Sequence, residues 1–320
     1  MKTQQLNLFR NETAKTTTKK KFFAQIEMEL PINSWVSMIL PFYSKATNNG
    51  RPRKNLEILL RMYIVKMCYN LSDEAVEDEL YESISVRNFC GISEDSDIPD
   101  HTSIWRFVQL LTQNNLQQKM FEEQVNQLII GKKIIRKGSH IDSTIVDTPS
   151  SKRNKNSESD PTSKWTAKGK NYRHGKKIHI GVDDDSGLVH SCVAKPANEH
   201  DLSAVEECLH GDEEFMMGDS AYLNAENHSE KAKKCKRHIM KRRTSVKKMS
   251  PHKQERRRRL EQAIASKRAK VEHVFGIIKG IFGFRYTRKW GMENFEGSMY
   301  FLCAMANIYK MTRTKKACLC

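Results

Sequence analysis

Three acidic residues stand where a carboxylate could act on a substrate. Asp142 lies inside a β-branched segment (HIDSTIV), Asp219 directly follows an apolar run (FMMG), and Glu272 lies beside the apolar stripe of a late helical segment. An unpaired carboxylate in a buried strand costs roughly a few kcal/mol, so something must compensate Asp142. Taken alone, Asp219 also suits a helix cap or turn, and Glu272 also suits a salt-bridged surface position.

Taken together, the three carboxylates predict metal-dependent chemistry. One lies mid-strand, one at a strand end and one on a helix, so all three could converge at one edge of a sheet. Hard oxygen ligands suit Mg²⁺ or Mn²⁺. Two such ions can activate an attacking water or hydroxyl and stabilise the leaving 3′ oxygen of a phosphodiester. Arg268 and Lys279 share a helical face with Glu272, and the plain alternative for Arg268 and Lys279 is ion pairing with that glutamate.

The first part of the chain reads as helical. Residues 1–24 are polar and rich in Thr and Lys, which predicts a disordered basic arm, and residues 25–130 show helical periodicity. One amphipathic helix is expected around Leu56 to Met67, and a second begins near Ser72 or Asp73.

A third helix is expected after Pro99, capped by Thr102 or Ser103, with Arg106 exposed. Helix, connector and helix with an exposed arginine are compatible with a helix-turn-helix that binds DNA, although plain helical bundles show the same spacing.

After Gly138 the pattern changes to short strands. The segments GSHIDSTIVDT, KKIHIGVDDDSG and LVHSCVA predict an antiparallel meander, followed by a helix over 201–209 and the strand before Asp219. This order predicts an α/β fold with an RNase H-like mixed sheet flanked by helices, preceded by an all-α domain, although other α/β domains could give it. His179 is expected to project toward Asp142, or to be a satisfied core histidine. Trp165 is expected in a long polar loop, where it stacks on an unpaired base or pins the loop.

Composition points to a polyanionic partner. The chain has 55 Lys+Arg against 38 Asp+Glu, a net charge of +17, and a dense basic segment from Lys231 to Gln262. Such a segment tracks phosphates or forms a solvated face, and its density favours phosphates. The eight cysteines include no zinc-like spacing and predict reduced thiols. No signal peptide or apolar run of about 20 residues is present, which predicts a cytoplasmic protein.

Several motifs, in order, resemble a known family. IDSTIVDTP, the segment through GVDDDSGLV, PANEHD, GDSAY and RAKVEHVFGIIKGIFGFRYTR resemble the catalytic motifs of bacterial DDE transposases of the insertion-sequence-five group, and PDHTSIWRFVQLL resembles an N-terminal element of that group. The resemblance covers residues from about 50 to 310. It implies a helical DNA-binding domain over 25–130 and an RNase H-like catalytic domain over 131–315.

The resemblance also implies residue roles. The catalytic and metal-binding triad would be Asp142, Asp219 and Glu272, with two Mg²⁺ or Mn²⁺ ions per site. In the related pattern Tyr-x2-Arg-x3-Glu-x6-Lys, this chain keeps Arg268, Glu272 and Lys279 but has Ala265 at the tyrosine place. The residues expected to contact DNA are Arg268, Lys279, Lys176, Lys177, Arg106, Arg242 and Arg243.

The implied activity is transposition. Such an enzyme binds terminal inverted repeats in double-stranded DNA, frees 3′ hydroxyls at the element ends and joins them to target DNA. It is expected to act as a homodimer or larger assembly on the bacterial nucleoid. Two alternatives remain: an RNase H-like nuclease without strand transfer, and a transposase-derived DNA-binding regulator without catalysis.

Overall fold

The computed structural model describes residues 16–43, 53–93, 98–150, 160–169, 171–241 and 243–318. The N-terminal half is helical, as the sequence predicts, and its elements are α1 (Thr18–Glu27), α2 (Ile32–Ile39), α3 (Leu56–Cys68), α4 (Asp73–Glu82), α5 (Ile84–Cys90), α6 (His101–Gln113) and α7 (Leu116–Ile130). Ser72 caps α4 by accepting a hydrogen bond from the backbone N–H of Ala75 at 3.1 Å. The cap of α6 is Asp100, which accepts from Ser103 N at 2.7 Å, and not Thr102 or Ser103.

The predicted arm ends earlier than residue 24. Helix α1 begins at Thr18, and Thr17 caps it by accepting from Lys20 N at 3.1 Å. Phe23 is buried and stacks on Phe89 of α5 at 4.4 Å between ring centroids. The aromatic side chains therefore dock a segment whose lysines suggested disorder, and residues 1–15 lie outside the described residues.

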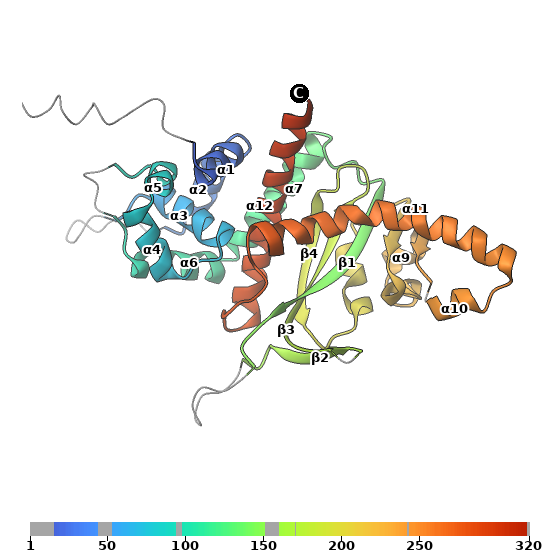
Figure 1. Cartoon of the computed structure of the whole chain (residues 1–320). Helices are drawn as coiled ribbons and strands as arrows, with labels where there is room; N and C mark the ends of the chain where they lie inside the picture. Colours follow the sequence, from blue (N-terminus) through green and yellow to red (C-terminus); the bar gives the residue numbers. More distant parts are fainter. Residues whose placement is uncertain are drawn as a thin grey trace, which may run out of the picture.

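The C-terminal helix α12 (Met292–Cys318) joins the two halves of the chain. Figure 1 shows it between the N-terminal helices and the sheet. Phe301 lies 4.5 Å from Tyr63 of α3 and 5.6 Å from Trp35 of α2, measured between ring centroids. On the sheet side, Asn307 accepts from the N–H of Val189 at 2.8 Å and donates to its carbonyl at 2.9 Å. The helical region and the sheet therefore share one hydrophobic core.

The sheet contains the predicted meander. β1 (Gly138–Asp147), β3 (Asn171–Asp183) and β4 (Val189–Pro196) pair antiparallel, and β5 (Phe215–Gly218) and β6 (Lys236–Ile239) extend the sheet in parallel beyond β1. The strand order is β2-β3-β1-β5-β6, with β4 also paired to β3. β2 (Lys164–Lys168) pairs with the start of β3, so Trp165 lies on a strand and not in a loop. The predicted fold class, an α/β sheet after a helical region, is confirmed.

Helices cover both faces of this sheet. One face carries η1 (Asp201–Ala204), α8 (Val205–Cys208), η2 (Ser220–Tyr222), η3 (Ala225–Asn227) and α9 (Glu230–Lys234), so the helix predicted over 201–209 is divided into two short turns. α10 (Arg243–Lys247) leads into α11 (Pro251–Gly276), which crosses the opposite face, as Figure 1 shows, and ends in a π-helical turn, η4 (Ile277–Ile281). No helix in the described part of the chain has the length and apolar character needed to cross a membrane. The cysteines whose side chains the structure describes are free thiols, and they are buried.

The register of β1 decides which residues share a face. Ser143 pairs with His179, whereas Asp142 pairs with Ile180. Directly opposed residues point to the same face of a sheet, so His179 lies on the face opposite to Asp142. The expectation that His179 projects toward Asp142 is therefore wrong. His179 instead lies with its Nδ1 3.9 Å from Asp201.

Lys176 is also placed differently from the prediction. Its side chain is fully buried, with Nζ 2.7 Å from Asp160 Oδ2 and donating to the carbonyl of Gly291 at 2.7 Å. Asp160 in turn accepts from Gly291 N at 3.1 Å. Lys176 is thus a structural cation that fastens the segment before β2 to the turn before α12, and its amine is not available to DNA.

We expect Asp160→Ala to lower the free energy of unfolding by about 3–5 kcal/mol, because it leaves the Lys176 ammonium buried without a counter-charge. Urea denaturation measures this. A matched control is Glu207→Ala, which breaks the exposed Lys195–Glu207 ion pair (2.9 Å) and should cost less than about 1 kcal/mol. Equal losses in the two variants would contradict the buried pair.

We expect His179 to make stability fall in mild acid. Burial lowers the pKa of His179 to about 4, and Asp201 offsets this only partly. The unfolded chain binds a proton near pH ~6.5, so between there and pH 4 protonation favours unfolding. From pH 7 to pH 5 this residue should remove roughly 2 kcal/mol. Urea denaturation of His179→Gln should show a pH dependence smaller by that amount, and an unchanged dependence would refute the assignment.

Candidate active site

The three predicted carboxylates border one cavity. Its volume is about 460 Å³, and it lies where β1, the end of β5 and the junction of α11 with η4 meet. Its lining consists of Asp142, Ser143, Thr144, Asp219, Arg268, Glu272, Phe275, Gly276 and Lys279. Five residues singled out from the sequence, three acidic and two basic, therefore share this cavity although they come from distant parts of the chain.

Asp142 is held from two sides. Its Oδ1 accepts from the N–H of Ser143 at 2.8 Å, and its Oδ2 pairs with the guanidinium of Arg268 at 2.8 Å. Burial nevertheless raises the pKa of Asp142 to about 6, because it outweighs the opposing effects of Arg268 and the Ser143 N–H, and the nearby Asp219 and Glu272 carboxylates add to the rise. The compensation that a mid-strand carboxylate requires is thus the Arg268 guanidinium, which pairs with Asp142 and not with Glu272.

Asp219 serves both as a cap and as part of the cavity. Its Oδ1 accepts from the N–H of Ala221 at 2.8 Å and so begins the short helix η2. The preceding Gly218 allows a close approach, since a Cβ atom there would lie 2.9 Å from the ring of Tyr222. The tight turn after β5 therefore directs the Asp219 carboxylate to the cavity.

Helix α11 is attached to one face of β1 at three points. His140 Nε2 contacts Asp184 at 2.7 Å, and the other oxygen of Asp184 pairs with Lys267 of α11 at 3.2 Å. Asp142 pairs with Arg268, as described above. Lys279 of η4 donates to Thr144 Oγ1 at 2.7 Å and also bonds the carbonyl of Ile145.

These contacts fix the position of Glu272 along β1. The first two are made by residues that precede Glu272 on α11, and the third is made by a residue that follows it. Burial lowers the pKa of Lys279 to about 8, and the neighbouring Arg173 acts in the same direction. Sequence reasoning missed the contact through Asp184, because its partners His140 and Lys267 are distant in the chain.

The other predicted DNA contacts whose side chains the structure describes lie apart from this cavity or are buried. Lys177 is 8% exposed and pairs with Asp201 at 3.0 Å, so, like Lys176, it is used inside the fold. Arg106 is exposed on α6. Arg242 lies outside the described residues, and Arg243 begins α10 with a side chain that is not described. Trp165 is 56% exposed on β2, with its ring centroid 5.1 Å from that of His174.

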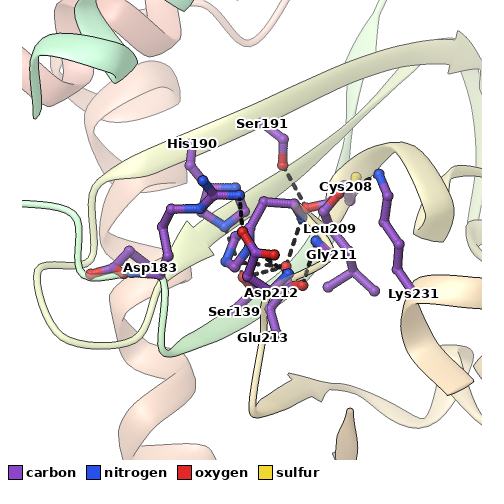
Figure 2. A network of polar contacts seen from close by, with 12 residues as sticks. Ser139, Asp183, His190, Ser191, Cys208, Leu209, Gly211, Asp212, Glu213 and Lys231 are labelled. Carbon is purple, nitrogen blue, oxygen red and sulfur yellow. Dashed lines mark hydrogen bonds and ion pairs between the residues drawn. The ribbon is translucent and has the colours of Figure 1, made fainter. Parts of the chain in front are cut away.

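A buried polar network joins β1, which carries Asp142, to the segment that leads into β5, which Asp219 follows. As Figure 2 shows, Ser139 of β1 donates to Glu213, just before β5, at 3.1 Å. Glu213 also accepts from the backbone N–H groups of His210 and Gly211 at 2.7 and 2.8 Å. His190 lies 2.9 Å from Ser139 Oγ. The network fixes β5 relative to β1. No sequence pattern predicts it, because its members lie far apart in the chain.

The donor set fits hard divalent cations, since three carboxylates face a polar cavity. Among the described residues, however, no group of three His, Cys, Asp or Glu side chains is already gathered closely enough to hold a metal ion. One Asp142 oxygen accepts a hydrogen bond from Arg268, so a cation bound to that oxygen would compete with the guanidinium for it.

Comparison with known families agrees with this geometry. A family model described as Transposase DDE domain matches residues 136–308, which is more than half of the chain. A second, described as Transposase domain (DUF772), matches residues 11–110 and so covers most of the helical region. No solved structure matches the chain significantly. With its sheet, its helical N-terminal region and its acidic cavity, the chain belongs to the Transposase DDE domain family.

Proposed function

We propose that this transposase moves an insertion sequence by binding its terminal inverted repeats, hydrolysing phosphodiesters at the element ends and joining the freed 3′ hydroxyls to target DNA. The observation that carries the proposal is the single cavity bordered by Asp142, Asp219 and Glu272 with Arg268 and Lys279. We assign it to the insertion-sequence-five group on its motifs.

Asp142, Asp219 and Glu272 are proposed to hold two Mg²⁺ or Mn²⁺ ions. When bound, such ions lower the pKa of an attacking water and stabilise charge on the leaving oxygen. The protein supplies the orientation: the Ser143 N–H fixes one oxygen of Asp142, and the Ala221 N–H fixes one oxygen of Asp219. These two aspartate carboxylates therefore keep a defined direction before any ligand enters.

Arg268 and Lys279 are proposed to bind the phosphate. Arg268 leaves Asp142 and turns its planar guanidinium to phosphate oxygens, which it can contact with two parallel N–H donors. This exchange needs no large movement, because both partners line the same cavity. Asp142 would then be free to hold a cation, and Arg268 would bind the phosphate.

The DNA duplex itself is proposed to lie along the basic surface of α11 and over the N-terminal helices. Exposed cations on the first half of α11 include Lys253, Arg256, Arg258 and Arg259. Cations that neutralise phosphates release counterions, so binding should weaken steeply with salt. Pairing two element ends requires two active sites, which supports a homodimer or larger assembly acting on DNA in the bacterial cytoplasm.

We expect Asp219→Asn to reduce metal-dependent cutting and joining of a labelled element end by at least about a hundredfold, since loss of outer-sphere partners alone costs 10–100-fold at such sites. Asn can still cap η2 through its side-chain oxygen, so folding and end binding should persist.

Asp185→Asn, in an exposed turn, is the matched control and should cut and join like the wild type. Cutting without joining by the wild type would indicate a nuclease, and salt-sensitive binding without any cutting would indicate a regulator.

We expect divalent-ion binding to be coupled to a proton. Because the pKa of Asp142 is about 6 in the metal-free protein, this carboxyl is mostly protonated below pH 6 and must ionise to bind a cation. Mn²⁺ affinity should therefore fall about tenfold per pH unit below pH 6 and be nearly constant above pH 7. Calorimetry in buffers of different ionisation enthalpy at pH 5.5 and 7.5 counts the protons. Proton release that is equal at both pH values would contradict the assignment.

A further inference from the structure

A fourth carboxylate, Asp201, lies behind the catalytic strand. It begins η1 on the face of the sheet opposite to α11. Its Oδ1 accepts from Ser143 Oγ at 2.9 Å and pairs with Lys177 Nζ at 3.0 Å. Lys177 also donates to the carbonyl of Glu199 at 2.6 Å, next to η1. Asp201 therefore fastens β1 and β3 to the segment that leads into η1.

Ser143 connects this carboxylate to the active site. Successive residues of a strand point to opposite faces, so the Ser143 side chain points away from the α11 face. Its backbone N–H, in contrast, donates to Asp142 Oδ1 at 2.8 Å. Asp201 anchors the hydroxyl of Ser143, and Ser143 holds the carboxylate of Asp142. A single residue thus links the two acidic groups across the sheet.

The electrostatic setting suits an ionised anchor. Burial alone would raise the pKa of Asp201, but its contact with Lys177 and its hydrogen bond from Ser143 outweigh burial and lower it. Asp201 also borders a second cavity, of about 660 Å³, which shares Ser143, Thr144 and Asp219 with the first. Asp201 could therefore either position Asp142 through Ser143 or bind a cation itself. Its Oδ1 is already engaged by Ser143 and Lys177, which favours positioning.

We propose that Asp201 is a positioning residue for the transposase site, which acts through Ser143 to hold the Asp142 carboxylate in the orientation that binds the divalent ion. This inference rests on the proposed function, because it assigns Asp142 as a metal ligand. Partners that orient a ligand from outside the coordination sphere typically change metal affinity by about 10–100-fold.

The test uses the full-length protein with Mn²⁺ as the probe. Mn²⁺ affinity is measured for Asp201→Ala, Ser143→Ala and the double variant, with Glu207→Ala on α8 as the matched control because it removes an exposed carboxylate on the same side of the sheet. We expect Asp201→Ala and Ser143→Ala each to weaken Mn²⁺ binding about tenfold or more. The double variant should be no weaker than Asp201→Ala, because both changes break one linkage. Glu207→Ala should bind like the wild type.

Two results would overturn the inference. Wild-type affinity in Asp201→Ala would remove the positioning role. A loss in Asp201→Ala with none in Ser143→Ala would make Asp201 a direct ligand instead.

A second readout, taken without metal, separates this inference from the proposed function. Hydrogen exchange of the Ser143 amide should accelerate in Asp201→Ala and not in Glu207→Ala, because this N–H is protected by its bond to Asp142. If the wild type binds no Mn²⁺, the proposed function fails, and the exchange result decides whether Asp201 still orients Asp142. Unchanged exchange would then overturn the inference as well.

Discussion

A carboxylate in the interior of the central strand is the constraint on which the rest of this structure depends. Asp142 lies where burial favours its protonated form, and Arg268 offsets part of that effect from α11. Because the compensating charge is on a long helix, the helix must be held at one height along the strand. His140, through Asp184 and Lys267, and Thr144, through Lys279, provide that registration. Glu272 acquires its position as a consequence.

The two faces of β1 have different surroundings. One face carries Asp142 and the contacts to α11, whereas Ile141 and Ser143 face the short helices from η1 to α9. Side-chain alternation therefore places the Asp142 carboxylate and the Ser143 hydroxyl, which donates to Asp201, on adjacent residues with opposite faces. The buried network around Glu213 adds a further contact between the start of β1 and the segment that leads into β5.

Much of the fold and the candidate site could be predicted because the signals are local. The apolar spacing of α3, the acidic first turn of α4 and the alternation in β3 depend on neighbours in sequence. The predictions failed where a distant partner decides. The register of β1 against β3 set the direction of His179, and the burial of Lys176 followed from Asp160 and the turn before α12. Helix α1 is held in place because Phe23 stacks on Phe89. The lysine-rich sequence of α1 gives no sign of this distant partner. A charge count cannot distinguish a solvent-exposed lysine from one that pairs with an aspartate in the protein interior.

The shared core around Phe301 has a consequence for the proposed binding of an element end. Tyr63 and Trp35 of the N-terminal helices pack on the same phenyl ring, and the same helix α12 is bonded to β4 through Asn307. The helical region is thus packed rigidly against the sheet through one shared core, and it is not joined to the sheet by a linker alone. If the helices bind the repeat, the rigid packing fixes the distance between the bound base pairs and the phosphodiester that is cut. A change of specificity in the helical region would then have to preserve this packing, which makes the two halves difficult to exchange between relatives.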